Sequence, residues 1–207
     1  MATTTPNYGL PVPTSADYVA QGAVAIEALG DAIDATVFGL PAPASGLTLL
    51  GTFTMSGTAT TTSVNNIFSA TYTNYKIIGY AKIASGTGNA FIKLRVSGVD
   101  SSASYYSLYN YVAIDVSSVG TTKASNSASG IVLGNFSTED TFFQFDIIRP
   151  NAAALTGFTG SYSQRYGANF FVSTNGGVHD VSLAYDGLTL TCATNLTGAF
   201  SVYGYQI

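Results

Sequence analysis

The chain has 207 residues, of which 46% are hydrophobic and only 9% are charged, whereas about 25% of the residues in an average soluble domain are charged. Its net charge of −4 and its isoelectric point near 4.6 argue against nucleic acid as a partner, since phosphate binding requires a basic surface. Small soluble monomers usually carry more charge than this, so we expect partner proteins to cover much of the surface.

Residues 1–39 combine an extended, Pro-containing arm with one short helix. Hydrophobic side chains recur at a seven-residue interval at Val19, Ile26 and Ile33, and Leu29 lies at the second apolar position of the repeat. This spacing is typical of a helix that packs against other helices, and it predicts that the chain forms an oligomer. The alternative is that the helix packs on the second domain of its own chain.

The charge is distributed unevenly along the chain. Residues 1–46 contain four acidic residues and no Lys or Arg, whereas residues 47–207 contain seven acidic and seven basic residues. The acidic segment could bind a basic socket on a partner, or its carboxylates could simply face solvent. The residues that we expect at the anchor or oligomer contact are Leu10, Val12, Val19, Ile26, Leu29 and Ile33.

A Pro-rich linker, residues 40–46, separates the helix from a second domain at 47–207. This domain contains short runs rich in Tyr, Phe, Ile, Val and Thr, divided by clusters of Gly, Ser and Asn, which predict about eight to ten antiparallel strands. DVSLAYDG is one of these runs. The predicted fold is therefore mainly β: an extended arm and a short helix, then an antiparallel β-sandwich of jelly-roll type.

The sequence offers little material for catalysis or metal binding. His179 is the single histidine and Cys192 the single cysteine, which argues against a multi-histidine or Cys-based metal site. We expect His179 to be a surface or hydrogen-bonded residue and Cys192 a small buried hydrophobe. The sequence contains no GxSxG motif and no P-loop. It therefore predicts no enzyme activity, no catalytic residues, no cofactor and no metal.

The sequence also gives no sign of membrane insertion or secretion. The opening residues, 1–9, lack the basic and apolar regions of a signal peptide, and no run of 18 apolar residues is present.

Tyrosines are concentrated in one predicted strand, SYYSLYNYV. Tyr105, Tyr109 and Tyr111 fall on one face of this strand, and Tyr106 falls on the other. Tyrosine rings among few charges can form a platform on which sugar rings stack, so these three residues are candidate glycan contacts. The alternative is that tyrosine fills the strand because of its high β-propensity.

Three segments resemble a known class of protein. The opening MATTTPNYGLPVPTSADYVAQGAVAIEALGDAID is similar to the N-terminus of small virion appendage proteins of tailed bacteriophages, which are fibre-like or minor structural proteins. The segments YTNYKIIGYAKI and YDGLTLTCATNLTGAFSVYGY resemble the β-domains of such proteins. The resemblance covers about half of the chain. It implies a homotrimer in the virion, anchored by its N-terminus and displaying a β-sandwich outward.

Two functions are compatible with this resemblance. The first is a short fibre or appendage, bound to capsid, tail or vertex proteins, with a host-surface glycan as candidate ligand. The second is a head-decoration, or cement, protein that stabilises the capsid. A glycan-binding appendage should present an exposed aromatic site away from the anchor, whereas a decoration protein should spread its contacts over several capsid subunits.

Overall fold

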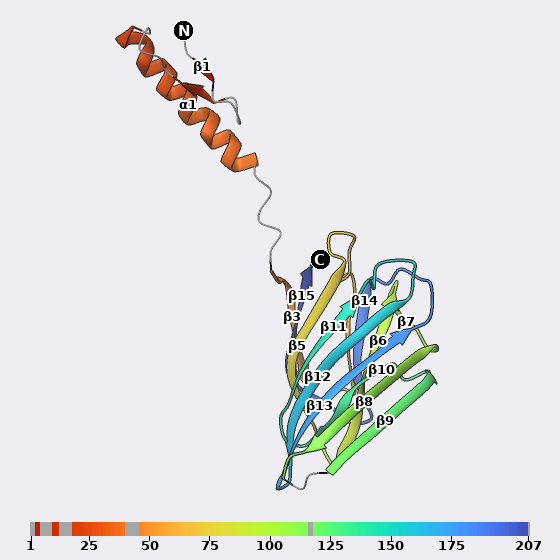
Figure 1. Ribbon diagram of the computed structural model, residues 1–207. Helices are drawn as coiled ribbons and strands as arrows, with labels where there is room; N and C mark the ends of the chain where they lie inside the picture. The colour runs from red at the N-terminus through yellow and green to blue at the C-terminus, as the bar shows by residue number, and fades with distance from the viewer. Residues whose placement is uncertain (1–2, 5–9, 13–17, 40–45, 116–117, 207) are drawn as a thin grey trace. The chain divides into compact units, whose positions relative to one another are not determined.

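In the computed structural model, residues 3–4, 10–12, 18–39, 46–115 and 118–206 are described (Figure 1). Contacts within the chain divide it into two compact units, Met1–Ala44 and Ser45–Ile207. The boundary falls inside the segment predicted to be a Pro-rich linker.

The N-terminal unit contains one helix and a small strand pair. Strand β1 (Thr3–Thr4) pairs antiparallel with β2 (Pro11–Val12), and β2 lies against helix α1 (Val19–Gly39). Six of the 21 residues of α1 are alanines, the strongest helix former. No helix in the described part of the chain is long and apolar enough to cross a membrane.

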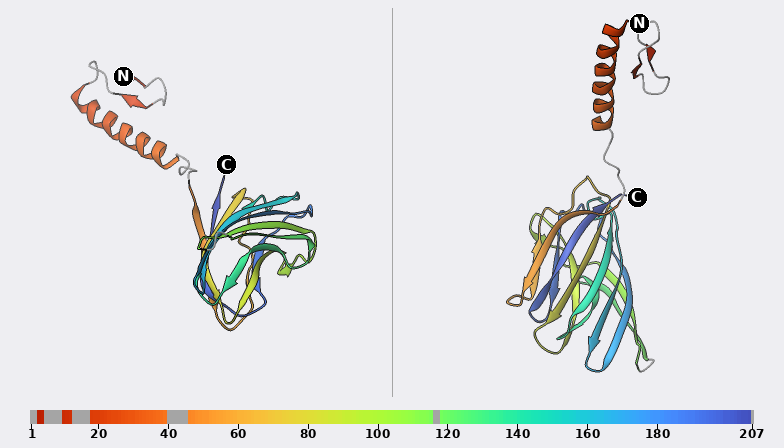
Figure 2. Two further views of the ribbon diagram at one scale, coloured as in Figure 1. Left: turned by 60° about the horizontal axis from the view of Figure 1, so that its bottom comes forward. Right: turned by 90° about the vertical axis from the view of Figure 1, so that its left-hand side faces the viewer.

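The second unit is a sandwich of two antiparallel sheets that face one another across a common core (Figure 2). The larger sheet has eight strands in the order β3-β15-β5-β11-β12-β13-β8-β9. Their bounds are β3 (Thr48–Ser56), β15 (Leu196–Tyr205), β5 (Asn74–Ile83), β11 (Thr141–Ile148), β12 (Thr156–Tyr166), β13 (Asn169–His179), β8 (Tyr105–Ala113) and β9 (Ser118–Ser127).

The smaller sheet has the strand order β10-β6-β14-β4, with the short β7 paired to β6. The chain changes sheet repeatedly, so strands that are adjacent in space are often distant in sequence; β15, for example, lies between β3 and β5. The bounds are β10 (Ile131–Ser137), β6 (Thr87–Val96), β14 (Gly187–Cys192), β4 (Thr61–Val64) and β7 (Val99–Asp100).

The predicted fold class, mainly β with one helix and an antiparallel sandwich, is confirmed. The predicted number of strands was too low, because none of the sequence runs used for the prediction corresponds to β4, β7 or β9. Strand β9 is an edge strand whose Ser, Thr, Lys and Gly residues lack the apolar alternation of a half-buried strand. Conversely, most of the run DVSLAYDG is a loop that precedes β14, although it buries Tyr185 completely.

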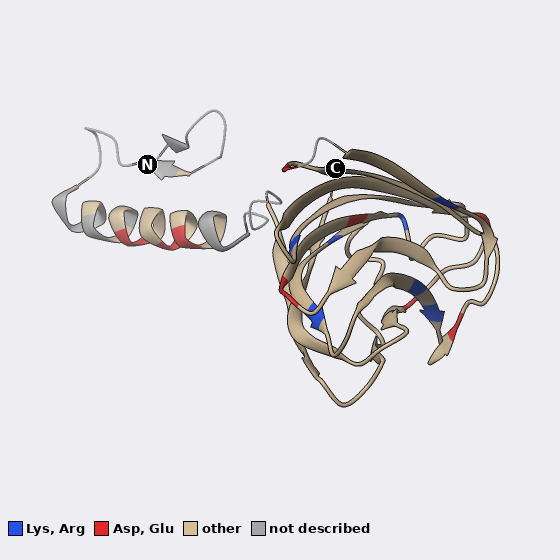
Figure 3. Ribbon diagram, turned by 90° about the horizontal axis from the view of Figure 1, so that it is seen from below, with Lys and Arg blue, Asp and Glu red and all other residues tan. Residues whose placement is uncertain are grey.

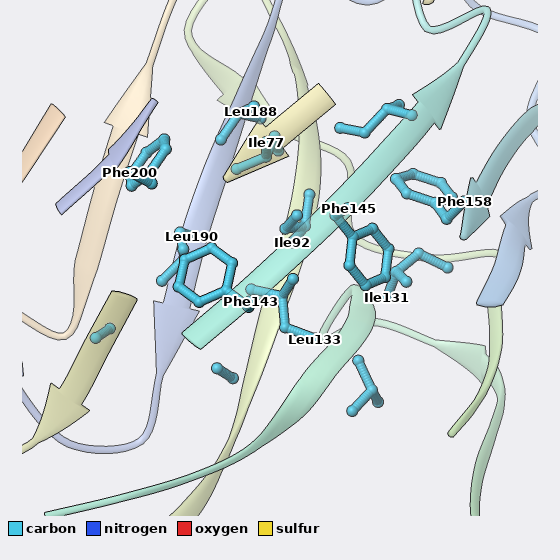
Figure 4. Packing of buried hydrophobic residues seen from close by; sticks show 14 of the residues in the cluster. Ile77, Ile92, Ile131, Leu133, Phe143, Phe145, Phe158, Leu188, Leu190 and Phe200 are labelled. Carbon is cyan, nitrogen blue, oxygen red and sulfur yellow. The ribbon is translucent and has the colours of Figure 1, made fainter. Parts of the chain in front are cut away.

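The core fills the space between the two sheets (Figure 4). The larger sheet contributes mainly aromatic rings and the smaller sheet mainly branched aliphatic side chains, all of them excluded from water. Cys192 is a buried free thiol in this core, as expected. The labelled members are Ile77, Phe143, Phe145, Phe158 and Phe200 from the larger sheet and Ile92, Ile131, Leu133, Leu188 and Leu190 from the smaller one.

The outer face of the larger sheet carries many apolar side chains that are open to solvent. Charged residues are sparse in the sandwich (Figure 3), so few charged side chains lie between these exposed apolar side chains. The exposed apolar residues of the four strands β5, β11, β13 and β8 are Ile78, Tyr80, Phe142, Phe170, Val172, Tyr106, Leu108 and Val112.

Candidate functional site

A cleft of about 300 Å³ opens between the two sheets at the end of the sandwich where β6 begins and β12 ends. Its walls come from both sheets, and five of the nine side chains that line it are aromatic. We call it the tyrosine cleft. The lining residues are Thr87, Tyr109, Tyr111, Thr122, Asn135, Tyr162, Gln164, Tyr166 and Phe171.

Four of the aromatic rings form a continuous cluster. The ring centroids of Tyr109 and Tyr162 lie 6.1 Å apart in an edge-on arrangement, and those of Tyr109 and Tyr111 lie 6.0 Å apart. The Phe171 ring lies 6.1 Å from that of Tyr111. Tyr109 and Tyr162 are almost fully buried and form the floor, whereas Tyr111 and Phe171 are half-buried and Tyr166 is exposed.

Glycines on neighbouring strands leave room for two of these rings. Gly120 of β9 pairs with Tyr111 of β8, and a Cβ atom at residue 120 would collide with the outer end of the Tyr111 ring. Gly134 of β10 faces Tyr162 of the opposite sheet, and a Cβ atom there would collide with that ring near its base. The positions of Tyr111 and Tyr162 therefore depend on glycine at residues 120 and 134.

The polar groups of the tyrosine cleft are uncharged. The side-chain oxygen of Asn135 is buried and has no hydrogen-bond partner within the chain. Gln164 accepts a hydrogen bond from the Thr141 hydroxyl at 3.0 Å, which fixes its amide. Burial, reinforced by the neighbouring Tyr109, raises the pKa of Tyr162 to about 12, so its hydroxyl stays protonated at neutral pH.

The three tyrosines predicted to stack on a glycan separate into two groups. Tyr109 and Tyr111 lie in the tyrosine cleft, as floor and wall. Tyr105 does not, and the prediction for this residue is corrected: it lies at the start of β8, at the far end of the strand, and is 0% exposed. Sequence alternation placed all three on one face correctly but could not show that the smaller sheet covers only part of that face.

Tyr105 belongs instead to a buried polar cluster. Its ring stacks on His179 with centroids 4.1 Å apart, and its hydroxyl accepts a hydrogen bond from the Leu94 backbone N–H at 2.8 Å. His179 is also fully buried and has ring nitrogens near Ser104 and Tyr185. The expectation that His179 is a hydrogen-bonded residue thus agrees with its surroundings, and its ring is closed to solvent.

The residues predicted at the anchor or oligomer contact all belong to the N-terminal unit. Ile26 is 64% exposed and Ile33 is 45% exposed, while Leu29 is half-buried. Leu10 is half-buried as well, and the side chains of Val12 and Val19 lie outside the described part of the structure. The acidic residues Glu27, Asp31 and Asp34 are exposed as well, and at about 100° per residue they lie on a different side of α1 from Ile26 and Ile33.

A second, more open depression of about 710 Å³ lies on the outer face of the larger sheet. Its apolar surface includes Phe142, Phe170 and Val172, all exposed. At its rim the guanidinium of Arg165 lies 5.9 Å from the Phe170 ring centre and 3.7 Å from a carboxylate oxygen of Glu139. We call this region the outer depression.

Seven of the nine residues that line the cleft were not predicted from the sequence, among them Tyr162, Tyr166, Phe171 and Asn135. These four lie on β12, β13 and β10, and no local pattern connects those strands to β8. Among the described residues, no group of three or more His, Cys, Asp or Glu side chains could hold a metal ion. Comparison with protein-family models, with curated protein sequences and with solved structures finds no match for this chain.

Proposed function

We propose that this chain is a bacteriophage virion structural protein without enzymatic activity, an oligomeric, fibre-like appendage with a trimer as the expected state. In this proposal the N-terminal unit attaches the protein to other virion proteins and holds copies together, and the sandwich is displayed outward. The proposal rests on the resemblance of the N-terminal segment to virion appendage proteins, together with the contrast between the two units.

The contrast between the units carries the most weight. The sandwich has a closed core of its own, with side chains such as Phe145, Ile92 and Leu188 at 0% exposure. Helix α1, by comparison, leaves Ile26 and Ile33 largely exposed. A short helix with an exposed apolar stripe gains stability by packing against partners, as a segment that is ordered by binding does.

The acidic side of α1 adds a chemical preference. Glu27, Asp31 and Asp34 give the helix a negative charge that no Lys or Arg of residues 1–46 offsets. A partner with basic residues beside an apolar groove would complement both features of the helix.

The outer face of the larger sheet supports the alternative function, head decoration. Exposed Phe142, Phe170 and Val172 surround the outer depression, and other exposed apolar residues continue the surface over β5 and β8. A broad apolar face on the β-domain is suited to contact with capsid subunits, without help from the helix. The proposed anchor and this alternative therefore place the contact on different units.

Attachment to particles distinguishes the two functions. Particles lacking the protein are mixed with the full chain or with a truncated chain that starts at Gly46, and bound protein is measured after sedimentation of the particles. The proposed function predicts that only the full chain binds, whereas binding of both forms supports the decoration function. Quantitative mass spectrometry of complete particles gives the copy number, with hundreds of copies expected for decoration and a few tens or fewer for an appendage.

A further inference from the structure

We propose that the tyrosine cleft is a binding site for an uncharged saccharide. The cleft lies in the sandwich unit, and its binding chemistry is independent of how the chain attaches to a particle. Three features carry the inference: the arrangement of the rings, the composition of the polar groups, and an amide oxygen without a partner.

The rings provide apolar faces at several angles. Tyr111 and Phe171 stand as walls over a floor made by Tyr109 and Tyr162, with tilts of 36° to 67° between contacting rings. Tyr166 is 45% exposed and lines the same cleft from the end of β12. The C–H faces of a sugar ring pack against aromatic faces of this kind, and the sugar hydroxyls remain free to form hydrogen bonds at the ring edge.

The polar groups around these rings suit a ligand rich in hydroxyls. Thr87 and Thr122 line the cleft from β6 and β9, and each carries a hydroxyl that can donate and accept. Asn135 contributes a buried amide oxygen that has no partner within the chain. A buried acceptor without a partner lowers stability, so a donor from a bound ligand or water is expected to satisfy it.

The absence of charge among the lining residues selects the class of saccharide. All nine described residues that line the tyrosine cleft are uncharged. A carboxylate or sulfate that entered this space would lose water without gaining a counter-charge, which is unfavourable. The cleft of about 300 Å³ is at the lower end of the usual range for ligand sites, which suits a short saccharide segment.

Ligand-detected NMR with the full-length protein tests the proposal. The probes are the methyl glycosides of glucose, galactose, mannose and N-acetylglucosamine, with glucuronate and galacturonate as charged counterparts of two of them. We expect saturation transfer to at least one neutral glycoside at millimolar concentration, and binding of either uronate at least about tenfold weaker than that of the best neutral glycoside because of the unpaired charge. Absence of binding to all four neutral glycosides, or tighter binding of a uronate, would overturn the proposal.

Variants connect the binding to the cleft. Tyr111→Ala and Tyr166→Ala each remove one aromatic face, and we expect each to weaken binding by about two- to tenfold. Tyr106→Ala is the matched control, since Tyr106 lies on the same strand as Tyr111 but on the outer face and is 37% exposed. Tyr166 is exposed at a strand end, so its removal should not disturb folding, which circular dichroism checks. Binding that survives both cleft substitutions, or that Tyr106→Ala removes, contradicts the proposal.

The appendage function and the saccharide site are tested by independent measurements. Saccharide binding is measured on free protein, whereas attachment is measured on particles with no saccharide present. A chain that attaches to particles but binds no neutral glycoside refutes only the cleft proposal. A chain that binds a glycoside through Tyr111 and Tyr166 but does not attach to particles refutes only the proposed appendage function.

Discussion

The Nε2 atom of His179 lies 2.6 Å from the hydroxyl oxygen of Tyr185, and both side chains are fully buried. The other ring nitrogen, Nδ1, lies 3.2 Å from the carbonyl oxygen of Ser104. A carbonyl oxygen can only accept, so Nδ1 carries a hydrogen. Burial lowers the pKa of His179 below its ordinary value of 6.5, so the imidazole is neutral at pH 7 and its Nε2 atom accepts a hydrogen bond from the Tyr185 hydroxyl.

This cluster predicts that the fold loses stability in mild acid. The unfolded chain binds a proton at His179 near pH 6.5, whereas the folded chain does so only at lower pH. The free energy of unfolding should thus be insensitive to this residue above pH 6.5 and should fall as the pH drops through 6.5 towards the lowered pKa. Urea unfolding at a series of pH values measures the effect. The variant His179→Gln should show a flatter profile over this range, and an equally steep one would contradict the assignment.

A second prediction concerns the hydroxyl of Tyr105. Tyr105→Phe keeps the ring that stacks on His179 but leaves the buried backbone N–H of Leu94 without its acceptor. We expect a loss of about 1–3 kcal/mol in the free energy of unfolding, the usual effect of an unsatisfied buried donor. Tyr106→Phe, on the exposed face of the same strand, is the control and should change stability little. Equal effects of the two substitutions would show that the Leu94 contact contributes nothing.

The fold class could be predicted because both of its signals are local. Alternating apolar residues mark half-buried strands such as β11, and the Pro-rich segment at 40–46 marks the end of the helix. The order of strands could not be predicted, since β15 pairs with β3 and β5 through contacts between distant parts of the chain. Strand β9 could not be recognised in the sequence, because an edge strand that buries few side chains needs no alternating apolar pattern.

The candidate site was predictable in part for the same reason. Alternation in β8 placed Tyr109 and Tyr111 on one face together with Tyr105. Only the three-dimensional arrangement shows that the smaller sheet and the loop before β14 enclose Tyr105, while the other end of the strand stays accessible. Asn135 carries no sequence signal for ligand binding, because its importance comes from an oxygen atom left without a partner.

Gly134 should be essential for the packing of the cleft floor. Gly134→Ala places a methyl group against the base of the Tyr162 ring, which is buried and cannot move aside. We expect a loss of about 1–3 kcal/mol in the free energy of unfolding, as overpacking of a core usually produces. Gly157→Ala is a suitable control, since a Cβ atom there would meet Ile148 at an ordinary 3.5 Å. Thermal and urea unfolding compare the two; similar stabilities would show that Tyr162 adapts without cost.

Gly120 tests the cleft wall without disturbing the core. Gly120→Ala collides with the outer end of the half-buried Tyr111 side chain, which can rotate away into the cleft. We therefore expect little change in stability but weaker binding of the neutral glycoside, by about two- to tenfold. Titration followed by ligand-detected NMR measures the affinity, and circular dichroism the fold. Unchanged affinity would mean that the position of Tyr111 does not matter for binding.

The last prediction concerns self-association through α1. Ile26 and Ile33 are seven residues apart and lie on one side of the helix, whereas Val24 lies on the opposite side, about 200° away from Ile26. All three are exposed, Val24 most of all at 65%, so exposure alone does not distinguish them. If the side with Ile26 and Ile33 is the oligomer contact, the double variant Ile26→Asp/Ile33→Asp should be a monomer at micromolar concentration. Val24→Asp adds a charge at an equally exposed site and should keep the oligomeric state of the parent chain.

Sedimentation velocity distinguishes these species, and circular dichroism should report the same β-rich spectrum for all of them, since the sandwich has its own core. A parent chain that sediments as a monomer rules out self-association outright. A parent oligomer that survives Ile26→Asp/Ile33→Asp places the contact elsewhere, and the exposed apolar face around Phe142 and Val172 is then the surface to mutate next. Dissociation by Val24→Asp alone would move the contact to the other side of α1 and would refute the assignment of Ile26 and Ile33.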